Sequence, residues 1–182
     1  HASRDYFRTY GAQPPDLPEA LHSTTWIGDR TVAHLEQAEA PFCLWTGFIK
    51  PHHPFDPPAR WLEQYDSEKL DLPPGWTETI PAMDRKGGYF DFGDLDPKTL
   101  RRVLAHYYAT ISHMDEQVGR ILKTLEERGM SNTVVIYHAD HGELLGHHHL
   151  LLKGAHMYDP MVRVPLIMTS MRGTRSFISR RK

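Results

Sequence analysis

Two segments of the chain gather side chains that could bind a metal ion or an anion. One is the proline-rich stretch Lys50-Pro-His52-His53-Pro54, and the other runs from Asp140-His141-Gly142-Glu143 to Lys153. A carboxylate and an imidazole that directly follow a buried strand can both reach a single ion, because the next glycine lets the backbone turn sharply. Elsewhere in a chain, an Asp-His pair is more often a turn in which the Asp is a cap. The position of the pair therefore decides whether it indicates a metal site.

The elements before these two segments are predicted to be strands. Residues 42–49 are apolar at nearly every position, which is typical of a strand covered by helices on both faces, and Cys43 would be a small buried side chain within it. Residues 133–138 are rich in β-branched side chains and predict a second buried strand, and residues 164–168 predict a third. Because ligands of α/β proteins bind beyond the carboxyl ends of strands, we expect both segments at one rim of the sheet.

Two helices complete the predicted fold. Residues 25–39 carry a modest amphipathic pattern that ends before Pro41. A long helix begins at Asp96-Pro97, a cap followed by a first-turn proline, and ends at Gly129. Its apolar residues recur in alternating steps of four and three residues, and they form one buried stripe of Leu100, Leu104, Tyr107, Ile111, Met114, Val118, Ile121 and Leu125. The order of elements predicts an α/β fold with a mixed, mostly parallel sheet layered between helices.

Charge and composition exclude several classes of partner. The 182 residues contain 21 Lys and Arg against 23 Asp and Glu, a net charge of −2, so we expect no electrostatic attraction to nucleic acid or anionic lipid. The longest apolar stretches, such as residues 42–49, are too short to span a membrane, and the single cysteine cannot form an internal disulfide. We therefore expect no membrane contact and a small molecule as the partner.

Four motifs, taken in order, resemble the sulfatase family of the alkaline phosphatase-like superfamily. They are Lys50-Pro-His52-x-Pro-Phe55, the long-helix pattern between Tyr107 and Leu122, Asp140-His-Gly-Glu143 followed by Leu145-Gly-x-His148 and Lys153, and Arg163-Val-Pro-Leu-Ile167. The resemblance extends over residues 25–168. It implies a sulfuric ester hydrolase that acts on a small-molecule sulfate or phosphate ester.

The same resemblance implies roles for individual residues. Asp140 and His141 would bind a divalent cation, Ca2+ in most sulfatases, with Mn2+ or Zn2+ as alternatives. Lys153 would hold an oxygen of the sulfate or of the leaving group, His52 would contact the ester oxygen, and His148 stands where the family motif has its histidine. Negative charge develops on these oxygens as the ester breaks, so a cation, an ammonium and an imidazole around one centre would stabilise the transition state.

One part of the family pattern is missing from the sequence. Sulfatases carry their nucleophile, a cysteine oxidised to formylglycine, in a Cys-x-Pro-x-Arg motif, alongside an Asp-Asp pair that binds the metal. Here the only cysteine is followed by Leu44-Trp-Thr-Gly, and no Asp-Asp pair occurs. Ca2+ takes about six to eight oxygen ligands, more than Asp140 and His141 supply. We therefore expect a fragment that holds half an active site, with the formylglycine upstream and little or no turnover by this chain alone.

The predicted organisation follows from this resemblance. Residues 1–24 would be an irregular approach segment, 25–169 a partial sulfatase-like catalytic domain with a surface excursion at 60–97, and 170–182 a disordered basic tail. The chain starts with His1 rather than Met, so any export signal would precede it. An exported (periplasmic or extracellular) and a cytoplasmic location both stay open, and so does the oligomeric state.

Two alternatives stay open as well. The Asp-His pair and the lysine do not separate sulfur from phosphorus, so a phosphonate or phosphodiester hydrolase of the same superfamily is equally consistent with them. Six histidines between His138 and His156 could instead form a non-catalytic metal-binding module that takes zinc. The remaining polar candidates are interpreted as structural or supporting residues: His147 and His149 in an exposed loop, His53 and His156 beside the site, His106 and His113 in helix packing, and Asp115, Glu143 and Arg163 as hydrogen-bonding or ion-pair supports.

Overall fold

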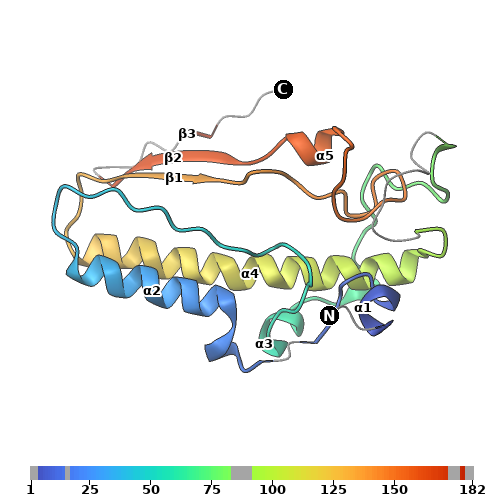
Figure 1. Cartoon of the computed structure of the whole chain (residues 1–182), viewed down its shortest axis with the longest axis horizontal. Coiled ribbons are helices and arrows are strands. Elements are labelled where there is room, and N and C mark those ends of the chain that lie inside the picture. Colours follow the sequence, from blue (N-terminus) through green and yellow to red (C-terminus); the bar gives the residue numbers. More distant parts are fainter. Residues whose placement is uncertain (1–3, 15–16, 83–91, 172–176, 179–182) are drawn as a thin grey trace.

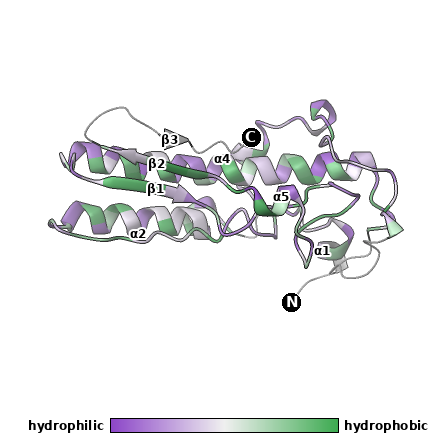
Figure 2. Cartoon of the chain, turned by 90° about the horizontal axis from the view of Figure 1, so that it is seen from above, coloured by the Kyte–Doolittle hydropathy of each residue, from purple (hydrophilic) through white to green (hydrophobic). Residues whose placement is uncertain are grey.

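The computed structural model describes residues 4–14, 17–82, 92–171 and 177–178, which form a layer of helices and a layer of strands (Figure 1). The helical layer is built on α2 (Ser23–Gln37) and the long α4 (Pro97–Glu127). The strand layer contains β1 (Val134–His138), β2 (Leu166–Ser170) and β3 (Phe177–Ile178). Seen from above, β1 and β2 run along the two helices (Figure 2). This arrangement confirms an α/β fold in which strands and helices are layered.

Helix α4 begins and ends where its sequence predicts. The Asp96 side chain accepts a hydrogen bond of 2.7 Å from the backbone N–H of Thr99, and Pro97 occupies the first turn. The helix ends before Gly129, which has a φ of +63° that glycine adopts without strain. Packing with α2 requires a second glycine, Gly28, because a Cβ at this position would collide with Gln117 of α4. Both predicted helices are therefore confirmed.

The sheet differs from the prediction in the direction of its strands. Its order is β1-β2-β3, and both pairings among the described strands are antiparallel, with Ile136 opposite Met168. The expected mostly parallel sheet is therefore wrong for this part of the chain. The connection from β1 to β2 contains only the short helix α5 (Asp159–Val162) instead of a long crossover helix, so the chain returns in the opposite direction. The tail also contributes a strand, β3, where disorder was predicted, while residues 172–176 and 179–182 of that tail lie outside the described residues.

Only one face of β1 and β2 is covered. Val134 and Ile136 of β1 and Leu166 and Met168 of β2 share the other face, where they are 41–64% exposed. Side chains of a strand alternate between the two faces, so the partly buried Tyr137 points to the opposite side, toward the helices. The prediction of strands buried on both faces is therefore wrong for the described residues.

Residues 42–49 are extended but do not belong to the sheet. Within the described chain no strand pairs with them, and Trp45 and Ile49 are 78% and 65% exposed. Cys43 is exposed as well, which corrects the expectation of a buried thiol. The segment contacts α2 through a 3.2 Å hydrogen bond between the hydroxyls of Thr46 and Thr31, and Trp45 contacts the His138 ring at 5.3 Å. A predicted strand forms only when a neighbour pairs with its backbone, and the part of the chain that the structure describes provides none for residues 42–49.

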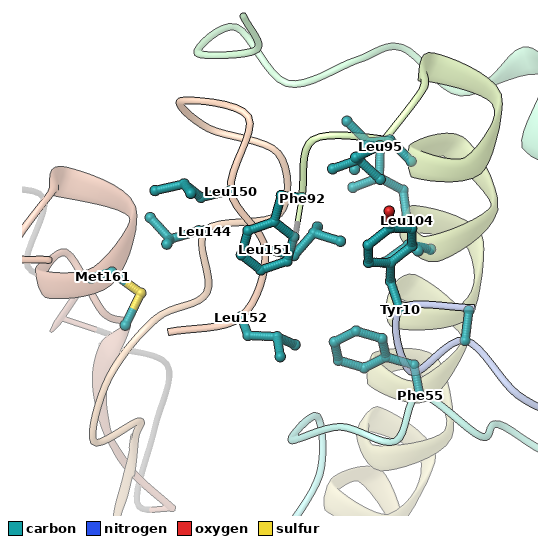
Figure 3. Packing of buried hydrophobic residues seen from close by; sticks show 13 residues of the cluster. Tyr10, Phe55, Phe92, Leu95, Leu104, Leu144, Leu150, Leu151, Leu152 and Met161 are labelled. Carbon is teal, nitrogen blue, oxygen red and sulfur yellow. The ribbon is translucent and has the colours of Figure 1, made fainter. Parts of the chain in front are cut away.

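The apolar core lies where the connecting segments cross one end of α4 (Figure 3). Phe55 and Leu100 are completely buried in it, and Leu152 is 1% exposed. Residues 60–97 also contribute, because Phe92 is buried and the cluster is bordered by Leu70, Leu72, Trp76 and Ile80. This segment contains α3 (Ala59–Leu62) at its start and the 3-10 helix η2 (Ser67–Lys69), while residues 83–91 lie outside the described residues.

The N-terminal segment is part of this core and is not irregular throughout. It contains α1 (Arg4–Arg8) and the 3-10 helix η1 (Glu19–Leu21). Tyr10 and Ala12 are buried in the core, and Ala12 forms a parallel bridge with Phe55. The prediction of an irregular approach segment is therefore wrong for these residues. The few apolar residues of the segment show no helical or strand period, so the sequence does not reveal that two of them are fixed by tertiary contacts.

A buried polar cluster joins α2, α3 and α4. His113 of α4 is completely buried, its Nε2 lies 2.9 Å from the Thr25 hydroxyl, and its ring packs against His22 at 4.9 Å and Trp61 at 6.0 Å. His113 Nδ1 is buried without a hydrogen-bond partner among the described residues. Burial, followed by the charge of His22, lowers the pKa of His113 to about 4. The helix packing therefore favours a neutral imidazole here, in agreement with the structural role predicted for this residue.

This cluster predicts a loss of stability in mild acid. The unfolded state binds a proton at His113 with a pKa near 6.5, whereas the folded state does so only near pH 4, so the free energy of unfolding falls as pH drops through this window. Between pH 7 and pH 5 the loss through this one group is about 2 kcal/mol. In urea unfolding at the two pH values, His113→Gln should flatten the pH dependence by about this amount and leave the part due to the other groups whose pKa differs between the folded and unfolded states. His34→Gln, at an exposed position of α2, should leave the slope unchanged; an equal slope in all three proteins would contradict the prediction.

Candidate active site

The loop formed by residues 50–56 is held by a buried ion pair at its base. The Lys50 ammonium is almost fully buried, donates a 2.6 Å hydrogen bond to the Pro54 carbonyl and binds the Asp56 carboxylate. His22 Nε2 lies 3.8 Å from the same carboxylate. Burial raises the pKa of Asp56, but the interactions with the nearby His22 imidazole and the Lys50 ammonium outweigh it and hold the pKa below its usual range. These contacts join the two ends of the loop, so that His52 and His53 lie at its tip.

The two histidines at the tip of this loop have different surroundings. Their rings lie 4.2 Å apart, and Nδ1 of the exposed His52 lies 2.6 Å from the His53 carbonyl. His53 is partly buried and pairs through Nδ1 with the Tyr6 hydroxyl. Burial lowers the pKa of His53 to about 4, and the charges of His52, Lys153 and Lys50 add to this effect. His53 is therefore neutral at pH 7 and lies within electrostatic reach of Lys153.

Asp140 and His141 follow β1 directly, as the sequence predicts. The Asp140 carboxylate accepts a 2.9 Å hydrogen bond from the His141 backbone N–H and is 88% exposed. Its pKa is raised by burial, but the hydrogen bond from His141 and the charges of His141 and Lys153 outweigh this and lower it overall. His141 Nδ1 lies 2.7 Å from the Gly142 carbonyl and must donate to it, which leaves the lone pair of Nε2 available.

This pair fits two positions of a metal coordination shell. His141 Nε2 and Asp140 Oδ2 lie 3.9 Å apart, and one ion placed at about 2.0–2.5 Å from each atom could join them. Hydrogen bonding of Nδ1 to a carbonyl is the usual way in which a ligating histidine is oriented. In the described part of the chain, however, no three His, Cys, Asp or Glu side chains are placed to share an ion. The pair is therefore an incomplete ligand set.

Lys153 lies beside two carboxylates. Burial lowers its pKa, and the charges of Glu143 and Asp140 oppose that effect. Burial raises the pKa of Glu143 to about 7, against the charge of Lys153 and backbone hydrogen bonds such as the one from Leu144. Among the described residues the Lys153 ammonium forms no hydrogen bond or ion pair, so it is free to bind an anion.

Asp140, His141 and Lys153 line one pocket, together with His156, Met157 and Met161. The pocket has a volume of about 370 Å³. His148 is not among its lining residues; its ring stacks on Tyr158 at 4.1 Å, and Tyr158 in turn stacks on His156 at 5.7 Å. His52 does not line the pocket either. The structure thus brings the metal pair and the lysine together directly, connects His148 to the lining residue His156 through Tyr158, and leaves His52 outside the lining.

The remaining histidines of the loop after β1 are structural. His149 is buried, which corrects the expectation of an exposed residue. Both of its ring nitrogens face carbonyl oxygens, that of Thr77 at 2.7 Å and that of Phe92 at 2.9 Å. Its ring stacks on Trp76 at 4.6 Å, and His147 forms a backbone bridge with Trp76. These contacts fasten the loop to residues 60–97 instead of directing imidazoles to a shared metal ion.

Sequence reasoning missed Tyr6 as a neighbour of the site. Tyr6 lies in α1, 47 positions before its partner His53, and nothing in the local pattern connects the two residues. The ion pair of Lys50 and Asp56 is also decided by packing, although both residues stand in one short motif. A buried lysine six positions before an aspartate shows no recognisable period, so only the folded loop reveals their contact.

Comparisons with known proteins agree with the motifs. The family model described as Sulfatase matches residues 2–182. The chain is 33% identical to the arylsulfatase of Clostridium perfringens over 163 residues, which is 86% of this chain and 34% of that protein. It is 32% identical over 171 residues to the uncharacterized sulfatase YidJ of Escherichia coli, covering 83% of this chain and 32% of that protein. The chain therefore spans about a third of the length of the curated relatives it matches.

The fold resembles that of solved hydrolases. The phosphonate monoester hydrolase SpPMH of Silicibacter pomeroyi superimposes with a TM-score of 0.70 at 26% identity, over 93% of this chain and 39% of that one. Separately, none of the helices within the described residues is long and apolar enough to cross a bilayer.

The base of the loop at 50–56 gives a prediction for stability. Asp56→Asn leaves the buried Lys50 ammonium without its carboxylate, so we expect a loss of about 3–5 kcal/mol in the free energy of unfolding. Glu127→Gln is the matched control because it breaks the exposed pair of Glu127 and Lys123, worth less than about 1 kcal/mol. Urea unfolding at pH 7 measures both changes. A loss for Asp56→Asn no larger than that of the control would show that the buried pair does not hold the loop.

Proposed function

Because the chain belongs to the sulfatase family, we propose that it contributes the metal- and anion-binding part of the active site of a sulfuric ester hydrolase. The observation that supports this most directly is the pocket that Asp140, His141 and Lys153 share. These are the residues to which the family resemblance assigns the cation and the sulfate. The loop at 50–56 would add the imidazoles of His52 and His53. The charge of Lys153 lowers the pKa of His53, so this loop is within electrostatic reach of Lys153.

The residues of this chain would act mainly by positioning charge. The Lys153 ammonium would bind an oxygen of the sulfate, and the nearby carboxylates of Glu143 and Asp140 favour its charged form. His52, whose Nδ1 donates to the His53 carbonyl, would give the Nε2 proton of its imidazolium form to the ester oxygen as the leaving group departs. Asp140 and His141 would hold a divalent cation, Ca2+ by analogy with most sulfatases, which when bound supplies positive charge to the sulfate oxygens. His148 would act from the edge of the site, through its stack on Tyr158.

The substrate would be a small-molecule ester of a tetrahedral anion. We favour a sulfate ester, since relatives at 33% and 32% identity are sulfatases by name. A phosphonate or phosphodiester substrate is the second candidate, and the likeness to the phosphonate monoester hydrolase SpPMH favours it. Lysine, imidazole and a cation bind oxygen atoms of either anion, so the substrate has to be decided by measurement.

The nucleophile would come from outside these 182 residues. Their single cysteine, Cys43, is followed by Leu44-Trp45-Thr46-Gly47 and does not match the Cys-x-Pro-x-Arg motif that is converted to formylglycine in sulfatases. Cys43 is exposed in the extended segment of residues 42–49. Hydrolysis would therefore require a nucleophile that this chain does not supply.

Hydrolysis of 4-nitrophenyl sulfate tests the proposal. The intact protein should release 4-nitrophenol, and Lys153→Met should lower kcat by about 10²- to 10³-fold, because one group that stabilises the transition-state charge is lost. His147→Gln, in the same loop but outside the pocket lining, is the control and should keep its rate. The 182-residue chain alone should show little or no turnover.

Three results would contradict parts of this proposal. Equal rates for Lys153→Met and the control would remove Lys153 from the site. Faster hydrolysis of 4-nitrophenyl phenylphosphonate than of the sulfate ester would favour the second candidate substrate. Robust hydrolysis by this chain alone, abolished by Asp140→Ala, would show that no outside nucleophile is needed.

Metal titration separates the hydrolase from a zinc-binding module. Because Asp140 and His141 are the only two His, Cys, Asp or Glu side chains placed to share an ion among the described residues of the pocket, calorimetry on the 182-residue chain should show weak binding of both Ca2+ and Zn2+. Asp140→Asn should weaken it further, while His149→Gln should not change it, because both ring nitrogens of His149 face carbonyl oxygens. Zinc affinity of micromolar or better that survives Asp140→Asn would favour the metal-binding module.

A further inference from the structure

We propose that Tyr6 holds His53 in the tautomer with hydrogen on Nε2, and that this Nε2–H donates to the same anion that Lys153 binds. The inference rests on the proposed function only for the identity of the anion, a sulfate or phosphate oxygen. It adds His53 as an anion-binding residue and Tyr6 as its positioning residue.

The contact between the two side chains fixes the direction of the hydrogen bond. The Tyr6 hydroxyl pairs with His53 Nδ1, and burial raises the pKa of Tyr6, so the phenol keeps its hydrogen at neutral pH. A phenol is a good donor and a weak acceptor, whereas the unprotonated nitrogen of a neutral imidazole is a good acceptor. The hydroxyl therefore donates to Nδ1, and the imidazole carries its own hydrogen on Nε2.

The backbone brings these two residues together independently of their side chains. Gly11 N–H donates to the Tyr6 carbonyl at 3.1 Å, and the Gly11 carbonyl accepts from the Phe55 N–H at 2.7 Å. Gly11 has a φ of +80°, and a Cβ there would lie 3.4 Å from His53 Cβ and 3.6 Å from the Tyr6 ring. The N-terminal segment is thus fastened to the loop directly beside His53, which limits the movement of the Tyr6 hydroxyl.

The second nitrogen of His53 is left open. Among the described residues Nε2 has no hydrogen-bond partner, and it is not one of the buried atoms without a partner, so it reaches solvent. The groups whose charges or hydrogen bonds act on His53 are Tyr6, His52, Lys50 and Lys153. None of these is a carboxylate. Lys50 is already paired with Asp56, whereas Lys153 forms no ion pair among the described residues. An open N–H donor within electrostatic reach of the Lys153 ammonium matches the oxygen of a tetrahedral anion.

Nitrogen-15 NMR of the imidazole rings tests the tautomer in the 182-residue chain. In the wild type, His53 should be neutral at pH 7 with hydrogen on Nε2. Tyr6→Phe keeps the ring and removes the hydroxyl, so the Nδ1-protonated form should appear and the pKa of His53 should rise toward the ordinary value. Tyr65→Phe removes another phenol hydroxyl, one that pairs with Ser112 at 2.6 Å, and should leave His53 unchanged. A wild-type His53 with hydrogen on Nδ1, or signals that Tyr6→Phe does not move, would overturn the tautomer lock without any reference to hydrolysis.

Titration with inorganic sulfate tests the anion contact. Sulfate should shift the His53 Nε2 signal and raise the pKa of His53, and His53→Leu should weaken sulfate binding by about tenfold, the factor for one hydrogen bond to a charged group. Sulfate that shifts the Lys153 ammonium signal but not His53 would overturn the role of His53 and leave the proposed function intact. No shift at either residue would overturn the anion site, and with it the proposed function.

Discussion

The arrangement of the site depends on the burial of Phe55 and Leu152 in one apolar core at the end of α4. Phe55 is completely buried, and its backbone binds Gly11, Gln13 and the His106 ring. Leu152 belongs to the same cluster (Figure 3). His53 stands two positions before Phe55, and Lys153 directly follows Leu152, so burial of the two apolar side chains brings the imidazole and the ammonium to the same side of the molecule. His53 and Lys153, 100 positions apart in the sequence, thereby share one electrostatic environment, which appears in the effect of Lys153 on the pKa of His53.

Near this core, the lysines Lys50 and Lys153 differ in their burial and in their ion pairing. Under the loop of residues 50–56, the ammonium of Lys50 is paired with Asp56, so its charge is neutralised inside the protein. At the pocket, Lys153 lies beside Asp140 and Glu143 but forms no hydrogen bond or ion pair within the described chain, and burial raises the pKa of Glu143 to about 7. The lysine with an ion pair shapes the loop, and the lysine without one lines the pocket. This division explains why a chain with a net charge of −2 can carry a pocket suited to an anion.

The strand layer is less complete than the core. One face of β1 and β2 and most of residues 42–49 are apolar and exposed, although strands of α/β proteins are usually covered on both faces. The chain spans about a third of the length of the curated relatives it matches, 34% and 32% for the two described above. The core at the end of α4 nevertheless positions the described half of the site, because its contacts come from α4, the N-terminal segment and the loops themselves.

The sequence by itself determined the elements with strong local signals and the pair after β1. These signals are local: the apolar stripe and the caps of α4, the β-branched run of β1, and the Asp140-His141 pair that follows it. Each of them involves residues that are close together in the sequence, so it can be recognised without the fold. Only the tertiary structure decided that the sheet is antiparallel, that residues 42–49 stay unpaired, that His149 is buried and that Tyr6 lies against His53. Strand pairing, burial and side-chain contacts depend on which distant segment supplies the partner, and this information lies in the packing of the whole chain instead of in any local pattern.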